Sequence, residues 1–146
     1  MKKLTIILTL LILSLLPSVA ANKHEANPIN LAVILTEKND SATMASVCEF
    51  YGYQAQPSQD GYTVYHHPNG SIIRFTFTPA EDGRRYATIE VKSTISSKEM
   101  DEILGDLRFQ QTGNVYSRQS FTHLTRCSYM QEYLHFSNHP KPKKKQ

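Results

Sequence analysis

The sequence between residues 73 and 92 is IRFTFTPAEDGRRYATIEVK, and both of its ends alternate apolar with polar side chains. The apolar positions are Ile73, Phe75, Phe77, Ala87, Ile89 and Val91. Successive side chains of a strand point to opposite faces of a sheet, so this period of two predicts two strands that are apolar on one face. Asp82 and Gly83 lie between them and form a turn sequence, which makes the pair an antiparallel hairpin.

Further strands are expected on both sides of this hairpin. The segment 62–66 leads into it through a Pro-Asn-Gly turn sequence. Three more strands are expected later in the chain, at residues 114–119, 121–127 and 129–136.

Two amphipathic helices are predicted among these strands. Asp40 is suited to cap the first helix, and Ser96 with Glu99 forms a capping box that begins the second. Their apolar side chains recur at helical spacing, at Met44, Val47, Cys48 and Tyr51 and at Met100, Ile103, Leu104 and Leu107. Each helix therefore has one apolar stripe that another layer must cover. The apolar run 31–35 fits a buried strand and the start of a helix equally well.

The whole pattern predicts an α+β fold in which the two amphipathic helices pack on one face of a mostly antiparallel sheet. Seven positions around the first helix have a counterpart 56 residues later, from Asp40 and Ser96 to Gln54 and Gln110. A duplicated helix–three-strand unit explains this correspondence, and so do two similar helices of independent origin. The layout resembles duplicated PepSY-type domains and the repeats of β-lactamase inhibitor protein, which are small exported modules. The sequence contains no motif of either, so no binding residue is transferred from them.

The sheet face turned away from the helices is predicted to combine polar and aromatic side chains. The candidate binding residues on this face are Arg74, Thr76, Tyr86, Glu90, Tyr129, Tyr133 and His135. Met130, Leu134 and Phe136 are expected on the helix-covered face. Such a mixture suits the capture of a protein or a glycan, although an antiparallel sheet also commonly keeps an ordinary polar face in water. The first functional hypothesis is a non-catalytic, inhibitor-like interaction module that binds a protein or glycan of the cell envelope.

The start of the chain has the pattern of a secretory signal peptide. Lys2 and Lys3 precede an apolar run over residues 4–16, which is shorter than the roughly 20 residues of a membrane span, and small residues follow it. We expect four segments: a signal peptide at 1–20, a flexible leader at 21–30, a single α+β domain at 31–139 and a basic tail at 140–146. This organisation predicts export to the periplasm or the extracellular space, with no transmembrane segment after cleavage.

The formal net charge of +3 arises outside the predicted domain. Without the signal peptide and the tail, ten basic residues stand against 13 acidic ones, and this balance does not favour nucleic acid as a partner. The basic residues of the tail are Lys141, Lys143, Lys144 and Lys145. These lysines suggest an alternative function, in which the tail attaches the protein to an anionic surface of the cell envelope.

Cys48 and Cys127 are the only cysteines of the chain. An oxidising compartment predicts a disulfide between them. The alternative is that Cys48, which lies in a helix stripe, serves as a small apolar side chain.

The histidines support a further alternative, a small exported hydrolase that works by acid–base chemistry. It requires His66 or His67 to converge with His123 or His135, beside a guanidinium from Arg74 or Arg126. The sequence shows no metal-binding pattern and no cofactor motif, so neither a metal nor a cofactor is expected.

Overall fold

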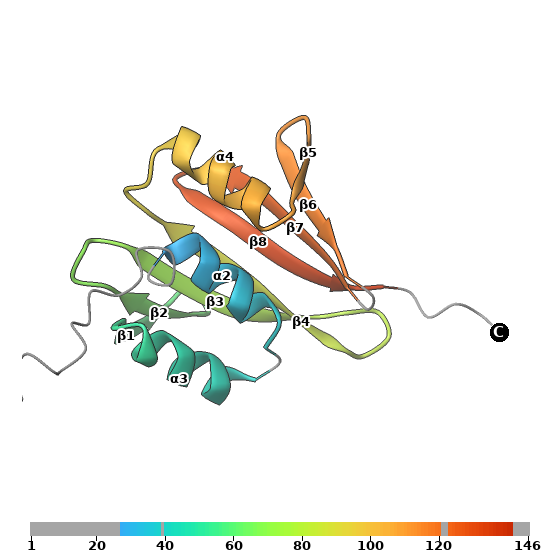
Figure 1. The fold of residues 1–146 in the computed structure, drawn as a ribbon. Helices are drawn as coiled ribbons and strands as arrows, with labels where there is room; N and C mark the ends of the chain where they lie inside the picture. Colours follow the sequence, from blue (N-terminus) through green and yellow to red (C-terminus); the bar gives the residue numbers. More distant parts are fainter. Residues whose placement is uncertain (1–26, 39, 121–122, 142–146) are drawn as a thin grey trace, which may run out of the picture.

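The computed structural model describes residues 27–38, 40–120 and 123–141 and shows an α+β fold (Figure 1). In these residues the helices are α2 (Pro28–Thr36), α3 (Ser41–Phe50) and α4 (Ser97–Asp106). The strands are β1 (Gln54–Gln59), β2 (Tyr62–His66), β3 (Ile72–Pro79), β4 (Arg85–Lys92), β5 (Gln110–Thr112), β6 (Val115–Gln119), β7 (His123–Met130) and β8 (Tyr133–Pro140). The predicted signal peptide and the end of the basic tail lie outside the described residues. None of the helices in the described part of the chain is long and apolar enough to cross a membrane.

The strands form one antiparallel sheet in the order β1-β2-β3-β4-β8-β7-β6-β5. Each half is a helix followed by four strands, and the halves meet where β4 pairs with β8, with Ile89 opposite Phe136. The predicted unit of three strands is therefore one strand short. The missing strands are β1 and β5, whose sequences QAQPSQ and QQT have no alternation of apolar and polar residues.

All three helices cover the same face of the sheet (Figure 1). Met44 of α3 and Met100 of α4 are buried in one apolar core with Phe75, Ile89 and Phe136 of the strands. The side chains of this core alternate along each strand, as the period of two in the sequence predicts. The predicted packing of helices on one face is confirmed, and the other face has no helix on it among the described residues.

The two halves repeat their helix geometry at the predicted offset. The N-cap side chains of Asp40 and Ser96 accept hydrogen bonds from the backbone N–H groups of Thr43 and Glu99, at 2.7 and 3.2 Å. Just after the helices, Gly52 and Arg108 occupy the left-handed region, with φ of 84° and 64°. This conformation turns the chain from each helix into the first strand of its half.

Helix α2 precedes the first half and lies between α3 and α4, mainly over β4 and β8. Asn27 caps it by accepting a hydrogen bond from the N–H of Ile29 at 2.8 Å, and the side chain of Ile29 is fully buried. The Nδ2 group of Asn138 donates to the carbonyl of Thr36 at 2.5 Å and fixes the other end. Residues 27–30, expected in a flexible leader, are thus part of the fold, and the ambiguous run 31–35 is helical because its side chains are buried on nearly all sides.

The predicted disulfide is wrong, because Cys48 and Cys127 are both free and buried. Cys48 lies in α3, which contacts β1, whereas Cys127 lies in β7 of the other half. Neighbouring strands are about 4.8 Å apart and four strands separate β1 from β7, so the Cα atoms are too distant for a disulfide, which requires less than about 7 Å. Burial raises the pKa of the Cys48 thiol to about 12, and it raises the pKa of Cys127 as well. Both thiols act as apolar core side chains.

Candidate binding surface

The sheet face opposite the three helices is called the open face below. Its composition follows from the strand register, since residues directly opposite each other in an antiparallel pair point to the same face. Arg74 of β3 is opposite Glu90 of β4, which is opposite His135 of β8. In the next row, Thr76 is opposite Thr88. The open face therefore combines charged, aromatic and hydroxyl side chains at the centre of the sheet.

Glu90 is the centre of a group of interacting side chains on the open face. Its carboxylate forms an ion pair with Arg74 and accepts a hydrogen bond from Nε of that residue. It also accepts a hydrogen bond of 3.3 Å from the hydroxyl of Tyr62. Nδ1 of His135 lies 3.3 Å from Oε1 of the same carboxylate. The guanidinium of Arg74 lies between two rings, 4.6 Å from the centroid of Tyr62 and 4.1 Å from that of Tyr133. These five residues are called the Arg74–Glu90 cluster.

The electrostatics of this cluster keep its charges in place. Glu90 is only 7% exposed, so its charge depends on the partners around it. Burial disfavours the charged form of Arg74, but the hydrogen bond and the charge of Glu90 outweigh this effect and raise the pKa of Arg74. Burial and the nearby charge of Glu90 raise the pKa of Tyr62, which therefore stays neutral and donates a hydrogen bond to the carboxylate. The cluster presents a fixed guanidinium between aromatic rings on the uncovered face.

The structure brings four of the predicted binding residues together: Arg74, Glu90, Tyr133 and His135 belong to this cluster. Thr76 lies in the neighbouring row and is partly exposed. Tyr86 is also on the open face, but it lies near the start of β4, away from the cluster, and its ring centroid is 4.7 Å from that of His139.

The predicted position of Tyr129 on the open face is wrong, because Tyr129 is opposite the buried Leu134 and lies on the helix-covered side, where it is 55% exposed. Met130 was expected beneath the helices, yet it is opposite Tyr133 on the open face and is 53% exposed. The cause is a turn at Gln131, with φ of 58°, which divides the predicted strand 129–136 into the end of β7 and the first half of β8. A hairpin pairs residues across its turn, so alternation cannot be continued through it.

Other residues of the open face were not predicted. Tyr62 lies in a strand that the sequence does predict, and the hairpin register relative to β3 assigns it to the open face. Arg126 and Ser128 of β7 and Ser137 and His139 of β8 also belong to this face, since they follow the register of His135. Their signal in the sequence depends on the position of the turn at Gln131, which the alternation alone does not give.

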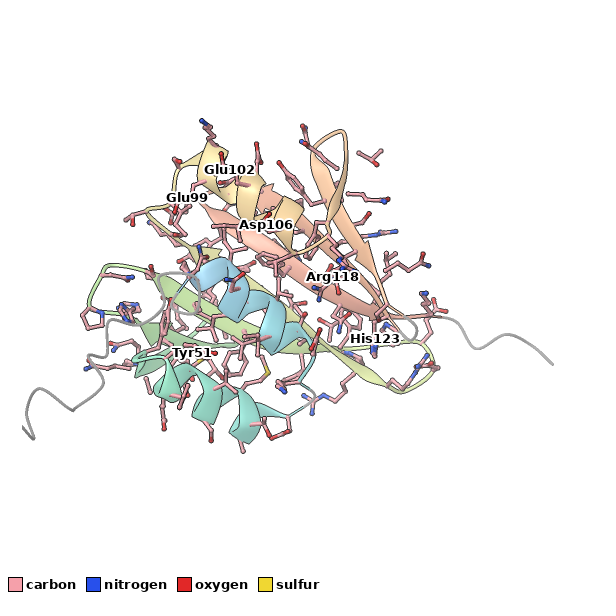
Figure 2. All side chains as sticks on the ribbon, in the orientation of Figure 1. Tyr51, Glu99, Glu102, Asp106, Arg118 and His123 are labelled. Atoms are coloured by element: carbon pink, nitrogen blue, oxygen red, sulfur yellow. The ribbon has the colours of Figure 1, made fainter. Side chains whose placement is uncertain are left out.

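The histidines named for a hydrolase do not converge. His66 of β2 and His135 of β8 have β3 and β4 between them, a separation of about 14 Å at the usual strand spacing. The ring of His67 packs 4.9 Å from that of Tyr53. His123 is at the start of β7, on the side of Arg118 (Figure 2), and lines a hollow with it. In the described part of the chain, no three His, Cys, Asp or Glu side chains are grouped as metal ligands would be.

Comparison of the chain with protein-family models, curated proteins and solved structures finds no match. The resemblance to PepSY-type domains and to β-lactamase inhibitor protein therefore stays one of element order. The function has to be argued from the open face itself.

Proposed function

We propose that this protein is an exported, non-catalytic binding module that holds a protein of the cell envelope on its open face. The observation that carries this proposal is the Arg74–Glu90 cluster, in which a charged pair is held beside two tyrosine rings on the side of the sheet where the described residues place no helix. Tyrosine and arginine are the side chains that most often dominate the binding energy of protein interfaces.

The energetics of the cluster support a role in binding rather than in stability. Removing charges from water is costly, and a largely buried ion pair contributes little net stability compared with apolar side chains of similar size. An arginine that is already fixed loses little conformational freedom when a partner arrives, so it contributes more to affinity than a mobile one. The small side chain of Thr76 is partly exposed in the row beside the cluster, where a partner can approach it.

Export is part of the proposal, and it is supported by the basic, apolar and small-residue segments of residues 1–20. The mass of the protein recovered from the cell envelope or the medium tests it. We expect the mature chain to begin at Ala21 or Asn22. Full-length protein recovered from the cytoplasm alone would contradict export.

The binding role is tested with two matched substitutions, Thr76→Arg on the open face and Ser46→Arg on the exposed side of α3. Both add the same side chain at a partly or fully exposed position, so both variants should fold with unchanged melting temperature. A partner cross-linked in intact cells to the wild-type protein should be lost from the Thr76→Arg variant and retained by the Ser46→Arg variant. Equal cross-linking by the two variants would eliminate the open face as the binding surface.

A further inference from the structure

A second feature of the open face lies beside the Arg74–Glu90 cluster, over β5 to β8. It is an open groove of about 610 Å³. Its basic side chains are Arg126, His135 and His139. Its hydroxyl side chains are Thr112, Ser117, Ser128 and Ser137. These side chains come from four different strands, so the groove is a property of the assembled half-sheet rather than of one segment.

The register places Arg126 at the middle of this groove. Arg126 is directly opposite Ser137 on one side and Ser117 on the other, and it is itself exposed. His135 is opposite Ser128, in the adjacent row. A guanidinium flanked by two hydroxyls presents several hydrogen-bond donors within one small area.

Arg126 gives the groove a permanent positive charge, and the described lining has no negative group of its own. None of the described residues that line it is an aspartate or glutamate. The nearest carboxylate that contacts a lining residue is Glu90, at 3.3 Å from His135, and Glu90 is already paired with Arg74. Burial, Arg126 and His135 lower the pKa of His139, so His139 stays mostly neutral at pH 7 and Arg126 supplies the fixed positive charge of the groove.

Acidic side chains gather instead on the other side of the sheet. Glu99, Glu102 and Asp106 lie on α4 (Figure 2). An anionic partner is therefore repelled by α4 and attracted to Arg126 in the groove, which favours docking on the open face.

We infer that the groove binds a carboxylate side chain from an extended acidic segment of the partner protein. A carboxylate matches the planar fork of Arg126 and accepts hydrogen bonds from the neighbouring hydroxyls. The remaining lining side chains, Val115, Leu124 and Met130, suit the aliphatic parts of a peptide. This inference rests on the proposed function, because it names the partner chemistry of the same open face.

The aromatic residues favour a peptide over a sugar as the occupant. A sugar ring is usually held by an aromatic ring face that is free to stack on it. Tyr62 and Tyr133 each turn a ring face to the guanidinium of Arg74, and the ring of Tyr86 lies against that of His139. These three tyrosine rings of the open face are thus engaged within the protein.

The test is an NMR titration of the mature protein at pH 6.5 and low salt with a blocked hexaglutamate peptide. Blocked hexaglutamine is the neutral control, and hexagalacturonic acid represents an acidic glycan. We expect hexaglutamate to shift the amide signals of Ser117, Arg126 and Ser137, and hexaglutamine to leave them unchanged.

The substitution Arg126→Gln should weaken hexaglutamate binding at least about fivefold, since it removes a charge-assisted hydrogen bond. The matched variant Arg85→Gln, at an exposed arginine of β4 outside the groove, should stay within about twofold, as expected for an exposed charge.

Three results would overturn the inference: no shift with hexaglutamate, an equal loss of affinity in both arginine variants, or tighter binding of hexagalacturonic acid in the groove. The proposed function is judged separately by cross-linking. If hexaglutamate does not bind but Thr76→Arg abolishes cross-linking, the inference fails and the binding module stands. If Thr76→Arg has no effect on cross-linking, the open face is not the docking surface and both fall.

Discussion

Glu90 is the residue on which the polar contacts of the open face converge, with Arg74, Tyr62 and His135 around one carboxylate. The substitution Glu90→Gln removes the charge that balances Arg74. Because the pair is largely buried, leaving one charge without its partner should lower the free energy of unfolding by about 2–3 kcal/mol. Urea unfolding at pH 7 measures this loss.

A double variant separates the cost of an unpaired charge from the contribution of the pair. In Arg74→Met with Glu90→Leu, both charges are absent and apolar side chains of similar size replace them. We expect the double variant to recover at least half of the stability that Glu90→Gln loses, since buried ion pairs are often replaceable in this way. A double variant less stable than Glu90→Gln would show that the pair itself stabilises the fold, contrary to the role proposed here.

His139 makes the stability of the protein depend on pH. Burial, Arg126 and His135 lower its pKa in the folded state below the ordinary value of about 6.5, which applies to the unfolded chain. The unfolded state therefore binds the proton more readily, and the stability from neutral His139 is present above pH 6.5 and lost as the pH falls through the lower folded pKa. Other charged groups also face this residue across the hollow at the β3–β4 turn, namely Glu81, Asp82 and Arg84.

The substitution His139→Gln removes this titration. The decrease in melting temperature between pH 7.5 and pH 5 should be smaller in this variant than in the wild type. His66→Gln, at an exposed histidine of β2, is the matched control and should follow the wild type. An unchanged pH dependence in His139→Gln would assign the effect to other groups.

Among the helices, α2 contributes most clearly to the core, because it lies over the two central strands β4 and β8. The substitution Ile29→Ala in its first turn opens a cavity at a fully buried position and should cost about 3 kcal/mol of unfolding free energy. The matched change Ile34→Ala, at a half-buried position of the same helix, removes the same atoms and should cost about 1 kcal/mol. Chemical denaturation of both variants measures the difference, and equal small losses would mean that the first turn of α2 is loosely held.

The elements that the sequence predicts best are those whose apolar side chains lie on one side. In β3, β4, α3 and α4 the buried apolar side chains form a single stripe, so period and caps identify these elements. Helix α2 is buried on nearly all sides and has no such stripe, which is why run 31–35 stays ambiguous in the sequence. The edge strands β1 and β5 bury almost nothing, so their sequences have no pattern to detect.

The part of the candidate site on β3 and β4 was predictable from the sequence, whereas the part on β7 was not, because it depends on the position of the turn at Gln131. Arg74 and Glu90 follow from alternation in two strands joined by an evident turn, and their pairing confirms the predicted face. Tyr129 was assigned to the wrong face, and Arg126 was not recognised as a residue of the open face, because glutamine at position 131 does not indicate a turn. Its left-handed φ of 58° is a conformation that glycine or asparagine usually supplies, so tertiary pairing rather than local sequence sets it.

At the scale of the whole molecule, the two halves share a single core rather than forming two. The strands β4 and β8 meet at the centre of the sheet, and α2 covers that junction. Both proposed contact regions lie across or beside this junction, since Glu90 is on β4 and His135 on β8. The binding surface is therefore rigid only if the two halves stay joined.

Hydrogen exchange tests whether they do. Amides of β4 and β8 are hydrogen-bonded within the sheet interior and covered by α2, so they should exchange only when the whole domain unfolds. The edge strands β1 and β5 open by local fraying, and their amides should exchange at least about tenfold faster. The measurement is amide exchange of the mature protein at pH 7, followed by NMR. If β4 and β8 exchanged as fast as the edges while β2, β3 and β7 stayed protected, the halves would separate in solution, and neither the Arg74–Glu90 cluster nor its contact with His135 would persist as a fixed surface.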